Sequence, residues 1–262
     1  MELREWEPLY NEIMEDFGFS KEDDLKSALM LSDIIRDIKN NIPLNNMDEL
    51  IKNKDVYVFG AGPSLKKHAK IVKELIESNY INENDKKNNN KENGNKYKNK
   101  NYIIISADGA TKALLEENIV PDIIVSDLDG DLNSIFESNE RGSVVVVHAH
   151  GDNMDNIKNH VCRLKNIIGS SQVPKDIPYL INYGGFTDGD RCCFFAEHFG
   201  AKRIILCGMD FGEYTTKYSR PYLKNDIEKA DDIKIKKLQY AEKLINWLKE
   251  NGNSEIVFID EL

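Results

Sequence analysis

The segment Ser126-Asp-Leu-Asp-Gly-Asp131 carries two carboxylates, Asp127 and Asp129, directly after the apolar run 123–125. Side chains two residues apart share a face of a strand, and at a strand end both can reach one cation. Carboxylates this close repel each other unless a metal or a proton lies between them. We therefore expect a Mg²⁺ site here, with a surface turn as the alternative interpretation.

More polar side chains follow other apolar runs. Asp108 and Gly109 follow one run, and His150 and Asp152 follow another. Because ligands of open α/β sheets bind beyond the carboxyl ends of the strands, we expect these residues near the same site, with Asp152 as a further metal ligand. His148 and His150 would share a strand face and also suit zinc, but no third nitrogen or sulfur ligand is close in the sequence.

A glycine-rich turn, Gly60-Ala-Gly62-Pro-Ser64, follows the apolar run 56–59. Glycine permits close backbone approach, and the N–H groups at a helix start can bind an anion. We expect a phosphate or nucleotide loop, and a purely structural turn is the alternative. The chain has no G-x-x-x-x-G-K-[ST] motif, and Lys66 stands where a dinucleotide fingerprint has its third glycine.

A second glycine turn contains Gly184, Gly185 and Thr187 and precedes an apolar helix that begins near Arg191. This helix start is a second candidate anion site, and the Arg191 guanidinium is suited to phosphate. A capped loop of purely structural use is the alternative interpretation.

The pattern between these motifs predicts an α/β protein with a Rossmann-like, three-layer, largely parallel sheet. Several apolar runs lack polar alternation, which is typical of strands buried on both faces. Strands are expected at 56–59, 102–106, 123–125, 144–147, 179–181, 204–207 and 256–259. Helices are expected between them at 64–78, 110–118, 153–165, 190–199 and 230–251.

The chain divides into three expected regions. Residues 1–54 form an N-terminal region with two amphipathic helices, residues 55–212 the α/β catalytic core, and residues 213–262 a helix and strand that complete the core. Within the core, residues 82–101 are an Asn/Lys-rich, low-complexity insertion that is expected to be a solvated loop.

The composition excludes several classes of protein. The 262 residues include 35 Lys plus Arg and 45 Asp plus Glu, a formal charge of −10 that argues against nucleic acid as partner. No apolar run approaches the roughly 20 residues that cross a bilayer, so no membrane association is expected. The four cysteines have no C-x-x-C spacing, and a reduced cytoplasm is the simplest location. A homodimer is an open alternative to a monomer.

Six motifs lie in order between residues 55 and 212: VFGAGPSL, SADGAT, PDIIVSDLDGD, HAHGDN, GGFTDGDR and GMDFG. They closely resemble the archaeal-type 6-hydroxymethyl-7,8-dihydropterin pyrophosphokinase family, which is similar in turn to thiamine pyrophosphokinase. Two elements depart from the thiamine family, because SDLDGD replaces G-D-x-D-S and HAHGDN is only loosely comparable with its D-x-D-x-T-D element.

The resemblance implies a fold like the thiamine pyrophosphokinase catalytic domain and a Mg²⁺- and ATP-dependent diphosphotransferase. Its acceptor would be 6-hydroxymethyl-7,8-dihydropterin and its other product AMP, on the route to tetrahydromethanopterin. The implied metal ligands are Asp108, Asp127, Asp129 and Asp152. We expect His150 or Asp152 to accept the hydroxyl proton. The residues expected to bind the nucleotide are Gly60, Gly62, Ser64, Asp108, Gly109, Gly184, Gly185, Thr187 and Arg191.

Other functions remain open alternatives. A related diphosphotransferase could act on a different hydroxymethyl acceptor. The DLDGD segment superficially resembles the start of haloacid-dehalogenase-type phosphatases, and the strand-G-P-S-L turn resembles that of some sialyltransferases, which use nucleotide sugars. A non-catalytic nucleotide-binding module is a third class, but it would not need several acids at the strand ends.

Overall fold

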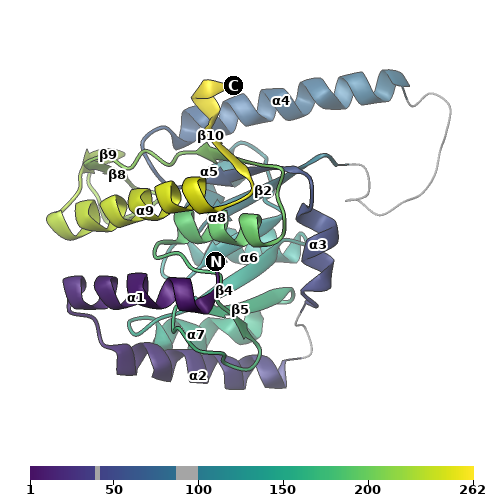
Figure 1. Ribbon diagram of the computed structural model, residues 1–262. Helices are drawn as coiled ribbons and strands as arrows, with labels where there is room; N and C mark the ends of the chain where they lie inside the picture. The colour runs from purple at the N-terminus through teal and green to yellow at the C-terminus, as the bar shows by residue number, and fades with distance from the viewer. Residues whose placement is uncertain (39–41, 87–99) are drawn as a thin grey trace.

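A parallel eight-stranded sheet forms the centre of the computed structural model, which describes residues 1–38, 42–86 and 100–262 (Figure 1). The strand order is β10-β7-β1-β2-β3-β4-β5-β6, and every neighbouring pair is parallel. The strands are β1 Asp55–Phe59, β2 Tyr102–Ala107, β3 Ile123–Ser126, β4 Val144–Ala149, β5 Ile167–Ser171, β6 Leu180–Ile181, β7 Arg203–Cys207 and β10 Glu255–Phe258.

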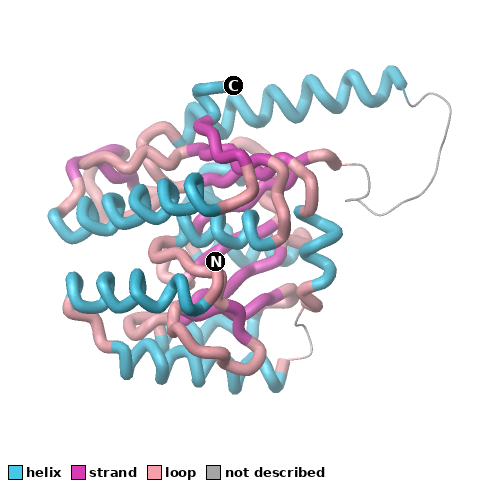
Figure 2. The backbone as a smooth tube through the Cα atoms, viewed as in Figure 1, coloured by secondary structure: helices cyan, strands magenta, loops and turns pink. Residues whose placement is uncertain are grey.

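Helices cover both faces of this sheet, as Figure 2 shows. One face packs against α1 Leu3–Phe17, α3 Asn45–Ile51, α8 Asp188–His198 and α9 Asp232–Asn251. The other packs against α2 Lys21–Asp37, α4 Leu65–Lys86, α5 Ala110–Glu116, α6 Leu132–Glu140 and α7 Met154–His160. The predicted Rossmann-like three-layer α/β fold is therefore confirmed.

The central strands are apolar throughout because both of their faces are covered. Every residue of β3, β4 and β5 is buried. Alternate residues of β3 enter opposite cores: Ile123 and Val125 pack under α1, α8 and α9, whereas Ile124 packs under α2, α6 and α7. Because all the strands of this sheet are parallel, their carboxyl ends lie at one edge of it, where the following loops can meet.

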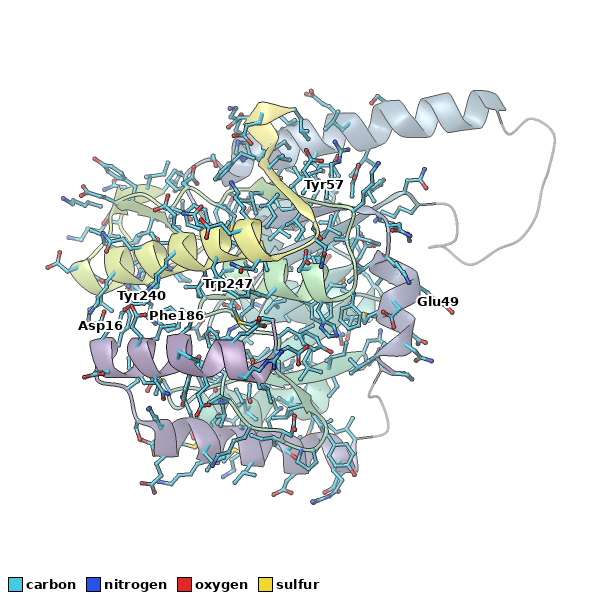
Figure 3. The ribbon with its side chains drawn as sticks, viewed as in Figure 1. Asp16, Glu49, Tyr57, Phe186, Tyr240 and Trp247 are labelled. Atoms are coloured by element: carbon cyan, nitrogen blue, oxygen red, sulfur yellow. The ribbon has the colours of Figure 1, made fainter. Side chains whose placement is uncertain are left out.

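The N-terminal helices pack on the sheet and also contact the last helix. The indole N–H of Trp6 on α1 donates to the carbonyl of Gln172 at 2.7 Å. On the other side of α1, the hydroxyl of Tyr240 on α9 donates to Asp16 at 2.6 Å, and the two residues lie side by side in Figure 3. The expected division of the chain near residues 54 and 212 stays a prediction.

Some elements differ from the sequence prediction. The predicted helix 153–165 divides into α7 and a 3₁₀ turn, Val161–Arg163. The predicted strand 179–181 shortens to β6 because Tyr179 has a φ of 65°, which an extended strand cannot contain. The elements not predicted are α3, α6, β5 and the two antiparallel strands β8 Tyr214–Thr216 and β9 Ile227–Lys229.

The Asn/Lys-rich segment begins inside a helix. α4 runs to Lys86, so the loop predicted for 82–101 is wrong for residues 82–86. Residues 87–99 of that segment lie outside the described residues. In the part of the chain that the structure describes, no helix combines the length and apolarity needed to cross a bilayer.

Candidate active site

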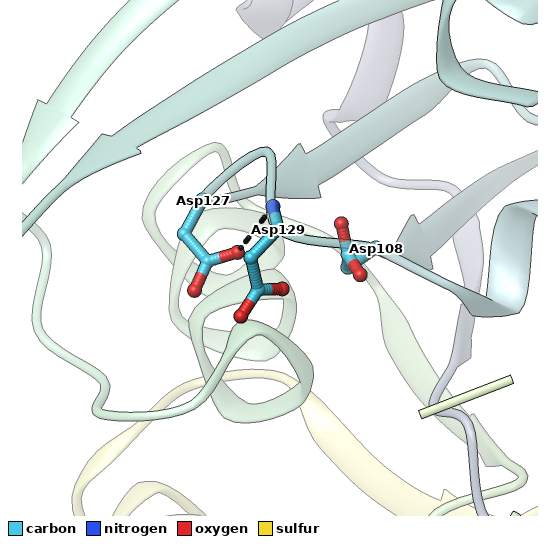
Figure 4. A group of neighbouring side chains, drawn as sticks. All are labelled: Asp108, Asp127 and Asp129. Carbon is cyan, nitrogen blue, oxygen red and sulfur yellow. Dashed lines mark hydrogen bonds between the residues drawn. The ribbon is translucent and has the colours of Figure 1, made fainter. Parts of the chain in front are cut away.

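Three aspartates, Asp108, Asp127 and Asp129, meet at the carboxyl ends of the neighbouring strands β2 and β3 (Figure 4). One carboxylate oxygen of each lies within 4.8 Å of the others. Within residues 1–38, 42–86 and 100–262, no other group of three or more His, Cys, Asp or Glu side chains is arranged in this way. The structure thus brings together three of the four predicted metal ligands.

Unusual backbone conformations orient these acids. Asp108 has a φ of 37°, and Leu128, between Asp127 and Asp129, has a φ of 65°. Residues other than glycine rarely adopt this region, and such conformations are concentrated at functional sites. Leu128 is buried, which anchors the turn. The carboxylates of Asp127 and Asp129 project to the same side of it in Figure 4.

The approach of Asp108 depends on a glycine in the next loop. The Ser126 hydroxyl donates to Asp108 Oδ1 at 2.5 Å, and the N–H groups of Gly109 and Gly130 also donate to this carboxylate. A Cβ on residue 130 would lie 1.8 Å from Asp108 Oδ2. Only glycine therefore lets the two loops come together.

The three acids repel one another strongly. Burial and the negative charge of Asp127 raise the pKa of Asp108 and of Asp129 well above the ordinary carboxyl range. Burial also acts on Asp127, but hydrogen bonds from His150 and Asp129 outweigh it and lower the pKa of Asp127. A divalent cation at this point would relieve the repulsion, and oxygen ligands of this type suit Mg²⁺.

The two histidines of the HAHGD segment have different surroundings. Nε2 of His150 lies 3.1 Å from Asp127 Oδ2, while the N–H of Asp152 donates to Nδ1 at 3.3 Å, which assigns the ring proton to Nε2. His148 is buried, and its Nδ1 lies 3.1 Å from the Ser170 hydroxyl. Burial lowers the pKa of His148 well below its usual value, so it is neutral. No described group of ligands supports the alternative of zinc.

A cavity of about 490 Å³ extends over the three acids, within the usual range for small-molecule sites. The predicted site residues that line it are Gly60, Gly62, Asp108, Gly109, Asp127, Asp129, His150, Asp152, Thr187 and Arg191. The other three, Ser64, Gly184 and Gly185, lie outside this lining.

The first glycine turn uses its N–H groups within the protein. The N–H of Gly60 donates to Cys207 O at 2.8 Å, and that of Gly62 donates to Gly208 O at 2.9 Å. The N–H of Ser64 donates to the Asp210 carboxylate at 3.1 Å. Asp210 thus takes the place at this helix start that an anionic ligand was expected to take.

The second glycine turn is capped in the same way. The carboxylate of Asp190 accepts the N–H groups of Phe186 at 2.6 Å and of Thr187 at 2.8 Å. Arg191 is buried and donates to Gln172 Oε1 at 2.8 Å and to Phe186 O at 3.2 Å. The backbone N–H groups of this turn therefore already have partners, whereas the Nε of Arg191 is buried without one. The role of both turns in nucleotide binding stays a prediction.

Several further polar residues line the cavity, and of these Asp188 lies in a motif that the sequence analysis names, GGFTDGDR. Asp188 begins α8, and its pKa is raised far above the ordinary value by burial and by the charges of Asp127, Asp108 and Asp129. Other polar lining residues come from α2, from the loop after β5, from the β8–β9 region and from α9, where the sequence gives no functional signal. Among these are Asp24, Gln172, Arg220, Lys234 and Lys237.

We expect Gly62→Ala to destabilise the protein by about 1–3 kcal/mol, the usual cost of overpacking. The added Cβ would lie 2.1 Å from Asp210 Oδ2 and 2.6 Å from Gly208 O, a backbone atom that cannot move alone. Urea unfolding measures the change. Gly212→Ala is the matched control, because its Cβ meets only Asp210 O at 3.9 Å. Equal unfolding midpoints for the two variants would contradict the packing argument.

Comparison with known proteins agrees with this site. The family model described as 6-hydroxymethylpterin diphosphokinase MptE-like matches residues 89–216. A 6-hydroxymethyl-7,8-dihydropterin pyrophosphokinase of Methanocaldococcus jannaschii is 55% identical over 98% of this chain and all of its own length.

Two further relatives with the same name match 98% of this chain. The protein of Methanothermobacter thermautotrophicus is 43% identical over 99% of its own length, and that of Pyrococcus furiosus is 42% identical over 98%. Each of the three alignments spans 98% of this chain. The chain therefore belongs to the 6-hydroxymethyl-7,8-dihydropterin pyrophosphokinase family.

Proposed function

We propose that this chain transfers a diphosphate group from ATP to 6-hydroxymethyl-7,8-dihydropterin, with AMP as the second product. The observation that carries the proposal is the group of three converging aspartates inside a cavity at the strand ends. Three relatives named 6-hydroxymethyl-7,8-dihydropterin pyrophosphokinase are 42–55% identical over 98% of this chain, and their name indicates the acceptor. No observation favours a phosphatase, a glycosyltransferase or another acceptor.

Mg²⁺ fits the donor set of this site. Asp108, Asp127 and Asp129 offer only carboxylate oxygens, and their mutual repulsion leaves negative charge uncompensated. We propose that these three residues hold the metal, which supplies charge neutralisation for the phosphate oxygens when bound. Asp152 is exposed at the cavity and lies outside the group of three, so its predicted role as a metal ligand has less support.

The chemical step breaks one bond and forms one. The hydroxymethyl oxygen of the pterin attacks the β-phosphorus of ATP, and the bond from that phosphorus to the oxygen shared with the α-phosphate breaks, releasing AMP. Such transfers depend on positioning and charge compensation more than on covalent catalysis. The protein therefore has to orient the acceptor hydroxyl and to remove its proton.

Between the two predicted proton acceptors, the contacts favour Asp152. Both nitrogens of His150 are engaged, one with Asp127 and one with the N–H of Asp152. The Asp152 carboxylate is exposed at the cavity and has no hydrogen-bond or ion-pair partner among the described residues. We assign His150 the role of holding Asp127 in position and Asp152 that of accepting the hydroxyl proton.

The remaining predictions concern the setting of the enzyme. We propose a cytoplasmic location, which all four cysteines support because none forms a disulfide. The homodimer stays a prediction.

Incubation with ATP, Mg²⁺ and 6-hydroxymethyl-7,8-dihydropterin should yield AMP and the pterin diphosphate in equal amounts by mass detection. Omitting the pterin should abolish AMP release, and excess EDTA should do the same through loss of the metal. Release of ADP, or of inorganic phosphate without acceptor, would contradict the proposed reaction. Thiamine in place of the pterin is the control for the acceptor.

A further inference from the structure

Four cationic side chains line the cavity in the described part of the chain: Arg191, Arg220, Lys234 and Lys237. Both arginines have partners within the protein, although the Nε of Arg191 is buried without one. Arg191 donates to Gln172 and Phe186, and Arg220 donates to Asp231 and, at 2.7 Å, to the hydroxyl of Tyr222. The two lysines, in contrast, have no hydrogen-bond or ion-pair partner for their ammonium groups among the described residues.

Neither lysine has a counterion. The ammonium groups of Lys234 and Lys237 form no hydrogen bond and no ion pair with any residue that the structure describes. Lys237 lies over two aromatic rings, 5.7 Å from the centroid of Phe19 and 5.9 Å from that of Phe186. Every ion pair formed by another lysine of α9 involves α1, and those lysines, Lys236 and Lys243, lie outside the cavity lining.

The two charges also repel each other. Lys234 and Lys237 are three residues apart on α9, so they lie on the same face of the helix. Burial, together with the charges of Lys237 and Arg220, lowers the pKa of Lys234, while Asp188 and Asp129 act in the opposite direction without reaching ion-pair distance. Like charges held together at a cavity without counterions favour an anionic ligand.

Besides the lysines, the Nε–H of Arg191 is a cavity-side donor without a partner. At the two glycine turns, the N–H groups of Gly60, Gly62, Ser64, Phe186 and Thr187 already donate to Asp210, Asp190 and backbone carbonyls. The three acids line the same cavity, and they repel phosphate unless a cation lies between. A phosphate chain that carries a divalent cation would suit both groups, because the cation would compensate the acids and the phosphate oxygens would accept hydrogen bonds from the lysines.

We propose that Lys234 and Lys237 bind the phosphate chain of ATP and hold the diphosphate group during its transfer. This inference rests on the proposed function, because it assigns residues to the donor nucleotide of that reaction. It gives α9, which carries no motif, a direct part in substrate binding.

The test replaces each lysine by methionine, which keeps the length of the side chain and removes its charge. We expect Lys234→Met and Lys237→Met each to lower kcat/KM for ATP by roughly 10- to 100-fold, the usual effect of losing a charged hydrogen bond. The KM for the pterin should stay within about twofold. Lys234→Arg and Lys237→Arg should recover most of the loss. Lys243→Met is the control, because Lys243 pairs with Glu12 at 2.6 Å outside the cavity.

A second measurement does not depend on turnover. Calorimetry with Mg²⁺ and inorganic pyrophosphate should show weaker binding to both methionine variants than to the wild-type protein and the Lys243→Met variant. In the wild-type protein, pyrophosphate with Mg²⁺ should protect Lys234 and Lys237, but not Lys243, from amine acylation read by peptide mass. The protection experiment decides the question even if a methionine variant fails to fold.

Wild-type affinity for pyrophosphate in both variants, or unprotected lysines in the wild-type protein, would overturn the proposal. So would a loss that falls equally on the KM values of ATP and pterin. If the wild-type protein forms no AMP, the proposed reaction fails, whereas pyrophosphate binding still reports on the lysines separately.

Discussion

Replacing Asp127 or Asp129 by asparagine should lower the rate of AMP release by roughly 10²–10³-fold, the usual effect of removing a group that stabilises transition-state charge. Asparagine keeps the size of the side chain but removes the charge that a metal requires. Both side chains belong to the group whose oxygens lie within 4.8 Å of one another. Coupled detection of AMP at saturating substrates measures the loss.

The Asp129→Asn variant should not be less stable than the wild-type protein. The charges of Asp127 and Asp108 act against the ionised form of Asp129, which is exposed at the cavity. Removing this carboxylate relieves repulsion in the metal-free protein, so we expect the Asp129→Asn variant to unfold at the wild-type temperature or above it. Asp155→Asn is the matched control, because Asp155 is exposed in the first turn of α7 and lies outside the cavity lining. Near-normal turnover in both site variants would remove the metal site from the mechanism.

Asp24→Ala should destabilise the protein by about 3 kcal/mol and lower its unfolding temperature by roughly 6–12 °C. The Asp24 carboxylate is 3% exposed and accepts three hydrogen bonds, from Tyr10 at 3.0 Å, Gln172 at 2.7 Å and the N–H of Gly151 at 2.8 Å. Loss of this carboxylate leaves the Tyr10 hydroxyl on α1, the Gln172 amide after β5 and the N–H of Gly151 after β4 without a partner. Calorimetric unfolding measures the effect.

The neighbouring residue offers the control for this experiment. The side chain of Asp23 is 45% exposed and its carboxylate pairs with Lys26 on α2 at 3.2 Å, so Asp23→Ala should leave the unfolding temperature nearly unchanged. A similar fall in both variants would mean that general disturbance of α2, and not the buried carboxylate, sets the stability. Wild-type stability of Asp24→Ala would show that water can replace the carboxylate.

The sheet was predictable wherever burial left a clear pattern in the sequence. β3 and β4 consist almost entirely of Ile and Val, because residues covered on both faces must be apolar. β5 escaped prediction because its Gly169 and two serines are small and polar, although all five residues are buried. α6 was not predictable because its start is signalled mainly by Asp131, which accepts the N–H of Ser134 at 3.0 Å and which is also the last residue of the acidic motif SDLDGD.

The acids of the site were predictable, whereas its cations were not. Asp127 and Asp129 follow a buried strand in one short motif, and the topology of a parallel sheet brings Asp108 to them. The sequence cannot show that Asp210 and Asp190 occupy the two helix starts, because these contacts join segments far apart in the chain or depend on the turn geometry. Lys234 and Lys237 look like any lysines of an amphipathic helix until the fold places them at the cavity.

The contact of Phe19 with Lys237 joins the beginning of the chain to its final helix beside the cavity. Almost the whole polypeptide lies between these two residues, and bringing such distant segments together costs loop entropy that only the finished fold repays. During synthesis, β2 and β3, which position the acids, leave the ribosome long before α9, which carries the lysines. We therefore expect catalysis to be the last property that the folding chain acquires.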